Sequence, residues 1–240
     1  MARDSADILT DDPPPAADER IQYAVGPLRF GDLRLPEGVG PHPLAVVVHG
    51  GAWKSTYNLI HTGHLCIALA QAGIASWNIE YRRVGDPGGG WPGSLDDVVL
   101  ALRHARELPG IDPERVVAIG HSAGGHLALL AVRQVRLRGV VALAAVTDPE
   151  TWDNPAVERF FGGPVPAGGA PRRLLPLGVP QVLVHGTADD VVPFEQSRAH
   201  AAAAGTEARL VPLDGAGHFE PIDPQADDFP RALTAMGALF

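Results

Sequence analysis

The sequence predicts an α/β fold in which helices cover both faces of a mostly parallel central sheet. Short apolar runs, typical of strands buried on both faces, recur along the chain. Helix-like segments lie between most of these runs, and strands that alternate with helices favour parallel pairing. At 240 residues the chain is long enough for one such domain.

The expected elements begin with a pair of strands and continue as buried strands separated by helices. The predicted strands are 21–25, 28–35, 44–48, 74–81, 115–119, 140–146, 181–184 and 208–212. The predicted helices are 61–71, 94–108, 123–135, 193–204 and 225–239. Ser94 is a good N-cap for the second helix, and Asp96 and Asp97 follow in its first turn, where carboxylates interact favourably with the helix dipole.

Two segments depart from this alternation. Residues 1–19 carry acids and a proline triplet but little apolar content, which predicts a disordered tail and places the folded domain at 20–240. Residues 147–179 are rich in proline and glycine, so that no long helix is expected there. Because long insertions at strand ends are usually functional or mobile, we expect a short cap segment over the site.

The composition favours small-molecule substrates over nucleic acid or membranes. The formal net charge is −9, and the 19 lysines and arginines form no basic patch of the kind that binds phosphates. No apolar run is long enough to span a bilayer, and the N-terminus lacks the pattern of a secretory signal, so a cytoplasmic location is the default expectation. The single cysteine, Cys66, lies in an apolar pattern and is expected to be a buried small residue.

The sequence predicts neither a metal nor a cofactor. The histidines include no H-E-x-x-H pair, and one cysteine cannot build a zinc site. No G-x-G-x-x-G or Walker spacing follows a predicted strand. The oligomeric state is not specified by any of these patterns.

The stretch GHSAGG, residues 120–125, follows the predicted strand 115–119 and matches the G-x-S-x-G pattern of a nucleophile elbow. In such an elbow Ser122 occupies a strained turn between strand and helix, and the small residues Gly120 and Gly124 let the neighbouring backbones approach. A simple glycine-rich turn is the alternative interpretation. The rest of the catalytic machinery decides between the two.

A serine hydroxyl is a weak nucleophile that needs a base and a group to orient that base. His218, in the loop between the last predicted strand and the last helix, is the strongest candidate for the base. Asp189 or Asp190 can supply the acid, since both follow the strand 181–184 and the carboxyl ends of parallel strands border the ligand crevice. Asp148, after the preceding strand, is a third candidate for the acid.

The stretch HGGAW, residues 49–53, follows the predicted strand 44–48. Acyl transfer develops negative charge on the carbonyl oxygen, and backbone N–H groups aimed at that position stabilise it. We expect the N–H of Ala123 to act with one or both of those of Gly51 and Ala52. A tight turn that merely ends a strand is the alternative.

Together, HGGAW, GHSAGGHLA, HGTADDVVP and GAGH resemble the α/β-hydrolase superfamily, in its esterase/lipase branch with an HGG-type oxyanion loop. That branch includes kynurenine formamidase-like and hormone-sensitive-lipase-like enzymes, and prolyl-oligopeptidase-like peptidases are near relatives. The resemblance implies an α/β-hydrolase fold with Ser122 as nucleophile, His218 as base and Asp189 as acid. Ala52 stands where the hormone-sensitive-lipase pattern has its third glycine, which is closer to the formamidase-like pattern.

The resemblance implies a serine hydrolase that cleaves small carboxylic esters through an acyl-enzyme intermediate and needs no cofactor. A formamide or amide hydrolase and a small peptidase are alternatives within the same fold. A non-catalytic binding protein is the alternative from a different class, because fold does not fix function.

Several side chains near these motifs are candidates to line the substrate pocket. They are Trp53, Trp91, His121, Trp152 and Phe160. Each is also compatible with core or loop packing, because aromatic side chains carry much of the buried area. We expect Arg82 to pair with Asp97 and brace a loop, and His126, one helical turn after the nucleophile, to be structural.

Overall fold

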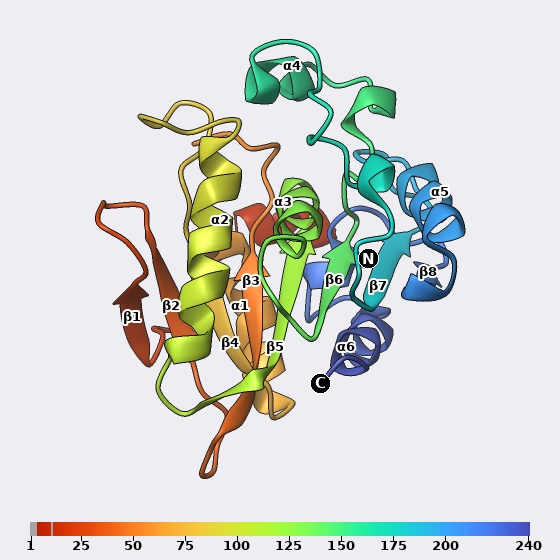
Figure 1. Ribbon diagram of the computed structural model, residues 1–240. Coiled ribbons are helices and arrows are strands. Elements are labelled where there is room, and N and C mark those ends of the chain that lie inside the picture. The colour runs from red at the N-terminus through yellow and green to blue at the C-terminus, as the bar shows by residue number, and fades with distance from the viewer. Residues whose placement is uncertain (1–3, 11) are drawn as a thin grey trace.

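The computed structural model describes residues 4–10 and 12–240, and its centre is one eight-stranded sheet (Figure 1). The strands are β1 Glu19–Gln22, β2 Phe30–Arg34, β3 His42–Val48, β4 Ala75–Ile79, β5 Ile111–His121, β6 Gly139–Leu143, β7 Gln181–Gly186 and β8 Ala208–Leu213. Their order across the sheet is β1-β2-β4-β3-β5-β6-β7-β8. Strand β2 runs antiparallel to both of its neighbours, and the remaining pairings are parallel. The predicted mostly parallel α/β sheet is confirmed.

Helices cover both faces of this sheet (Figure 1). They are α1 Gly63–Gln71, α2 Gly93–His104, α3 Ala123–Ala131, α4 Pro155–Phe161, α5 Glu195–Ala204 and α6 Phe229–Gly237. Helices α2 and α3 pack on one face, and α1 and α6 pack on the other. Short 3-10 helices extend or join these elements: η1 Ser5–Leu9, η2 Leu59–Thr62, η3 Ala105–Glu107, η4 Pro149–Thr151, η5 Pro171–Leu174, η6 Gly205–Glu207 and η7 Glu220–Ile222.

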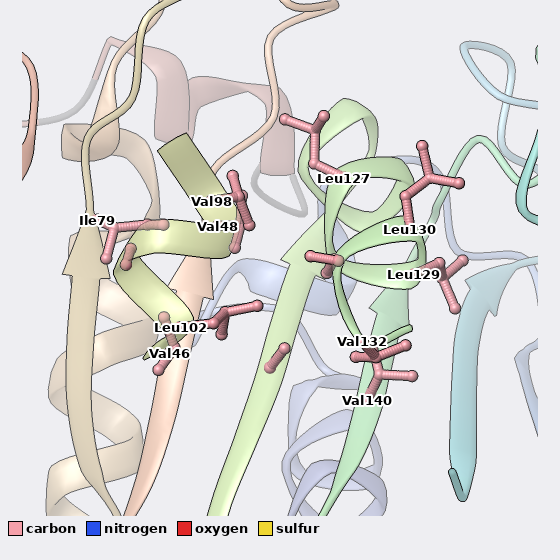
Figure 2. Close-up of a cluster of buried hydrophobic side chains, with 14 of the residues drawn as sticks. Val46, Val48, Ile79, Val98, Leu102, Leu127, Leu129, Leu130, Val132 and Val140 are labelled. Atoms are coloured by element: carbon pink, nitrogen blue, oxygen red, sulfur yellow. The ribbon is translucent and has the colours of Figure 1, made fainter. Parts of the chain in front are cut away.

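The central strands divide the hydrophobic core into two clusters. Successive side chains of a strand point to opposite faces of the sheet, so Val46 and Val48 of β3 join one cluster and Val47 joins the other. Figure 2 shows part of the first cluster, which includes Val98 and Leu102 of α2. Because both faces are covered, the buried stretches 44–48 of β3, 116–119 of β5 and 139–143 of β6 are continuous apolar runs without alternating polar residues.

The second helix begins differently from the prediction. Its N-cap position is Pro92, and Ser94 lies inside the first turn. The Ser94 hydroxyl donates to the carbonyl of Arg82 and accepts from the amide of Gly90 at 3.1 Å. The expected N-cap at Ser94 is therefore wrong, because the loop before the helix engages the hydroxyl.

Asp97 on the same helix is completely buried and accepts hydrogen bonds from two arginines. The Nε atoms of Arg82 and Arg29 lie 2.7 and 2.9 Å from its carboxylate. The predicted pairing of Arg82 with Asp97 is confirmed. It fixes the chain that follows β4 to helix α2.

The N-terminal segment also differs from the expected disordered tail. Helix η1 buries Ile8 in the cluster beneath α1 and α6. His64 of α1 contacts the carbonyl of Asp12 through Nε2 at 3.1 Å. The buried residues Ser5 and Ile8 and the contact of His64 place the described part of this segment against the domain. Residues 1–3 and 11 of the predicted tail lie outside the described residues.

The segment 147–179 forms a short helical excursion beyond the carboxyl ends of the strands (Figure 1). Its longest helix, α4, has Asn154 as N-cap, with the side chain accepting from the Ala156 amide, and it ends at Gly162 in the left-handed conformation. The proline at the first helical position and the glycine at the end explain why only seven residues are helical. That this segment caps the site remains a prediction.

Replacing Asp97 with alanine should lower the free energy of unfolding by about 3 kcal/mol, because breaking a buried ion pair leaves charges uncompensated. Urea unfolding measures the change. The matched control is Glu195→Ala, which removes the exposed ion pair with Arg198 and should cost less than about 1 kcal/mol. Equal effects in the two variants would contradict the structural role of Asp97.

The lowered pKa of the buried histidines predicts how stability depends on pH. Burial lowers the pKa of His126 and of His200 from 6.5 to about 4. Each therefore binds a proton in the unfolded chain before it does so in the native one. This contribution to stability is complete above about pH 6.5 and is lost as the pH falls toward about 4, with a slope of about 1.4 kcal/mol per pH unit for each histidine. Urea unfolding of His200→Gln across this window should show one such slope less than wild type, and an unchanged slope would contradict the prediction.

Candidate active site

Ser122 lies in a sharp turn between β5 and α3. Its φ and ψ are 54° and −120°, in a region that residues with a side chain rarely adopt. The turn depends on its two flanking glycines: a Cβ on Gly120 would lie 2.4 Å from the carbonyl oxygen of Gly124, and one on Gly124 would lie 2.1 Å from that of Val48. The backbone therefore has the geometry of a nucleophile elbow.

His218 and Asp189 form a buried pair near this turn. The two side chains meet at 2.7 Å between Nδ1 and Oδ2, and only 4% of the His218 side chain is exposed. The other carboxylate oxygen of Asp189 accepts the amides of Val191 and Val192, at 2.8 Å each. An acceptor at Nδ1 fixes the proton there and leaves Nε2 of His218 free to accept a proton from a hydroxyl.

The carboxylate of Asp189 stays ionised in spite of its burial. Burial by itself raises its pKa, but hydrogen bonds from His185 and His218 and the amide of Val192 lower it well below its ordinary value. His185 approaches Oδ2 through Nε2 at 3.0 Å, while its other nitrogen contacts the Ser197 hydroxyl at 2.7 Å. Asp189 is thus an anion held on several sides.

The two other candidate acids lie differently. Asp190 is exposed. Asp148 is buried and forms an ion pair with Arg172. The structure therefore brings Asp189 to His218, whereas Asp148 links the start of the segment 147–179 to helix η5 within the same segment.

His121, predicted to touch substrate, packs between the nucleophile turn and the base. Its Nε2 donates to the carbonyl of His218 at 3.0 Å, and the two ring centroids are 4.7 Å apart. Burial, reinforced by His218 and His61, holds the pKa of His121 well below its ordinary value. It is a neutral packing residue that joins the Ser122 turn to the loop of His218.

The loop 49–53 lies directly against the elbow. A Cβ on Gly50 would lie 3.0 Å from the Cβ of Ser122. Gly51, Ala52 and Trp53 all have positive φ, of 106°, 51° and 56°. Ala123 opens helix α3, where a first-turn N–H has no acceptor within the helix. The predicted oxyanion donors therefore belong to two segments that meet at Ser122.

Three of the predicted pocket residues are buried against one another. Trp53 and Phe160 stack with centroids 4.5 Å apart, and Trp152 meets Trp53 edge-on at 6.0 Å. The exposed fractions of Trp53, Phe160 and Trp152 are 0, 2 and 6%. In this arrangement they connect the oxyanion loop to α4, and among the predicted aromatics Trp91 alone keeps partial exposure.

The expected structural role of His126 agrees with its contacts. This residue is fully buried, packs edge-on against Trp53, and donates from Nε2 to the Gly169 carbonyl at 2.8 Å. Its pKa is lowered by burial. It ties helix α3 to the segment 147–179.

Sequence reasoning missed two residues of the site. His185 lies in the motif that supplies Asp189. Its contact with Ser197 joins β7 to α5, and no sequence pattern in either segment indicates it. Glu80, which no sequence motif singles out, lies with Oε1 at 3.0 Å from Nε2 of His49. His49 and Glu80 each follow the last residue of a strand, β3 and β4, and these strands pair in parallel. Predicting that β3 and β4 are neighbours would therefore have suggested the contact.

The prolyl oligopeptidase family matches residues 91–221, which hold the elbow and the candidate acid and base. The chain belongs to this family. A second family, BD-FAE, matches residues 32–149, which include the oxyanion loop and the elbow. The α/β-hydrolase resemblance that the sequence motifs imply is confirmed.

Curated relatives of this prolyl oligopeptidase family member include esterases and a peptidase. Esterase LipC of Mycobacterium tuberculosis is 27% identical over 244 residues, covering 85% of this chain and 60% of LipC. Dipeptidyl peptidase family member 2 of Caenorhabditis elegans is 25% identical over 215 residues, covering 74% of this chain and 26% of the relative. The chain thus spans about a quarter of one relative and three-fifths of the other.

A solved structure has the same fold. Esterase 2 of Thermogutta terrifontis, phosphoramylated by tabun, superposes with a TM-score of 0.77 over 93% of each chain, at 24% sequence identity. This similarity confirms the expected α/β-hydrolase fold. No helix in the part of the chain that the structure describes is long and apolar enough to cross a membrane.

Asp189→Asn should lower kcat by a factor on the order of 10⁴, because an amide donor at this position favours the wrong tautomer of the base. The matched control is the adjacent Asp190→Asn, which changes an exposed carboxylate and should leave kcat within about twofold of wild type. Steady-state kinetics on an activated ester compare the two variants. A larger loss in Asp190→Asn, or in Asp148→Asn, would reassign the acid.

Proposed function

We propose that the chain is a serine esterase that hydrolyses small carboxylic esters, with Ser122 as nucleophile, His218 as general base and Asp189 as the orienting acid. The observation that carries the proposal is the buried contact of 2.7 Å between His218 and Asp189, next to an elbow with the strained backbone of a nucleophile. Relatives named as esterases support an ester substrate.

Acylation begins when Oγ of Ser122 attacks the ester carbonyl and its proton passes to Nε2 of His218. The negative charge moves to the carbonyl oxygen, where the N–H groups of Ala123 and of Gly51 or Ala52 stabilise it. Collapse of this tetrahedral intermediate expels the alcohol, which takes the proton from His218. Asp189 keeps the imidazolium oriented throughout and does not itself take the proton.

Deacylation repeats these steps with water. Nε2 of His218 accepts a proton from water, and the resulting hydroxide equivalent attacks the acyl carbonyl. The second tetrahedral intermediate expels Oγ of Ser122, which recovers its proton from His218 and releases the carboxylic acid.

The segment 147–179 supports a small substrate. Helix α4 is only seven residues long, and its aromatic residues Phe160 and Phe161 both pack against Trp53. The amide of Trp91 donates to the carbonyl of Phe160 at 2.9 Å, which attaches α4 to the loop before α2. A helix fixed in this way offers little apolar surface for a long acyl chain, so we propose short, largely uncharged esters.

Amide hydrolysis is the second candidate activity. The match to the prolyl oligopeptidase family favours it, because that family is named for a peptidase, and a formamide substrate needs the same acylation chemistry. Amides and esters differ in the leaving group, which His218 must protonate more fully for an amine. The ester is favoured by the relatives that carry esterase names.

Along a p-nitrophenyl series from acetate to palmitate, kcat/KM should be highest for the short acyl chains and fall steeply toward palmitate. N-formylkynurenine and a prolyl anilide measured in parallel test the amide alternatives. Ser122→Ala is the control, and it should lose nearly all turnover while its Tm stays close to wild type, because only the nucleophile is removed. A maximum at palmitate would contradict the small pocket, and anilide turnover above every ester would favour the peptidase.

A further inference from the structure

The first residue of the oxyanion loop, His49, has hydrogen-bond acceptors at both ring nitrogens. Nδ1 lies 2.8 Å from the carbonyl oxygen of Gly50 and Nε2 lies 3.0 Å from Oε1 of Glu80. The ring is completely buried and the carboxylate nearly so. A carbonyl oxygen can only accept, so Nδ1 carries a proton and donates to Gly50.

The Glu80 carboxylate is ionised where it meets this ring. Burial alone raises its pKa, but the hydrogen bond and charge of His49, the charge of Arg83 and the amide of Tyr81 lower it below its ordinary value. Arg83 approaches the same oxygen at 2.9 Å. An ionised carboxylate only accepts, so Nε2 of His49 also carries a proton and the ring is held from both sides.

The bond to Gly50 fixes the orientation of a whole peptide unit. In a trans peptide the carbonyl of one residue and the N–H of the next lie in one plane and point in opposite directions. Since the Gly50 carbonyl points to the His49 ring, the Gly51 N–H points away from it. Gly50 packs closely against Ser122, because a Cβ atom added to Gly50 would lie only 3.0 Å from the Cβ of Ser122.

The loop beyond this peptide needs such a constraint. Ala52 and Trp53 have φ of 51° and 56°, a strained conformation that residues with a side chain rarely adopt. The His49 backbone is fixed as well, because the Tyr81 hydroxyl donates to its carbonyl at 2.9 Å and the two rings stack at 4.5 Å. Strained backbone persists only where neighbouring contacts over-determine it.

We propose that His49, held by Glu80, is a positioning residue that orients the Gly50–Gly51 peptide so that the Gly51 N–H faces the carbonyl oxygen attacked by Ser122. This inference rests on the proposed function. It assigns the imidazole of the HGGAW stretch a role in the transition state that acts through the backbone, without any contact to substrate. The pair joins the end of β3 to the end of β4, so adjacent parallel strands set the donor geometry.

Two substitutions of one residue separate this role from simple packing. The amide nitrogen of asparagine occupies nearly the place of Nδ1, so His49→Asn keeps a donor to Gly50, whereas the amide of His49→Gln reaches only toward Glu80. We expect His49→Gln to lower kcat by about 10- to 100-fold with KM nearly unchanged, less than the 10²- to 10³-fold loss on deleting a donor outright. His49→Asn should stay within a few fold of wild type.

The binding of a trifluoromethyl ketone gives an independent reading, because its hemiketal carries an oxyanion. Its affinity should fall in His49→Gln by the same factor as kcat/KM and should be kept in His49→Asn. His200→Gln is the matched control, since it also replaces a fully buried histidine, one whose Nε2 contacts Gln181 in another part of the fold. It should leave kcat within about twofold at neutral pH.

Nitrogen NMR tests the peptide orientation without turnover. The amide signal of Gly51 should shift in His49→Gln and stay near its wild-type position in His49→Asn, and in wild type both ring nitrogens of His49 should carry protons. An unchanged Gly51 signal or a full kcat in His49→Gln would overturn the inference. If His49→Gln does not fold, a wild-type ring without the Nδ1 proton would overturn it. Absence of ester turnover in wild type would instead contradict the proposed function.

Discussion

The hydrogen bond between Nδ1 of His218 and Oδ2 of Asp189, 2.7 Å long, is the contact on which the rest of the site depends. The two residues are far apart in the sequence and meet because they follow β7 and β8, which pair in parallel along their whole length. The carboxyl ends of parallel strands face the same edge of the sheet. The same pairing, extended through β6 to β5, brings the turn of Ser122 to this edge.

Further hydrogen bonds hold Asp189 and the loop of His218 in place around this contact. Asp189 is held by His185 and by two loop amides. The loop of His218 is held by the His121 ring, one residue before the nucleophile. Asp189 and the loop of His218 are thus each fixed by neighbouring hydrogen bonds, which is how a scaffold holds a site in one geometry.

The sequence predicts the parts of this site that chemistry demands and fails where long-range packing decides. Ser122, Asp189 and His218 can be predicted as candidates from the sequence because a nucleophile, an acid and a base must each be of that type and follow a strand. The partner of His49 was not, because Glu80 lies 31 residues away and meets it only through the adjacency of β3 and β4. The expected N-cap at Ser94 fails because the loop before the helix engages its hydroxyl. Sequence patterns also do not reveal that Trp53 and Phe160, both candidates for the pocket, are buried and pack against each other in the structure.

Strand β8 stands at the edge of the sheet, with β7 as its one neighbour, and the loop that carries His218 follows it directly. Edge elements open locally at lower free energy than the centre of a sheet, where Ser122 and its strand lie. Separation of β8 from β7 would divide His218 from Asp189 while the central strands stay paired. On heating, we therefore expect the proposed activity to be lost in a sub-global transition that leaves most of the secondary structure and its amide protection intact.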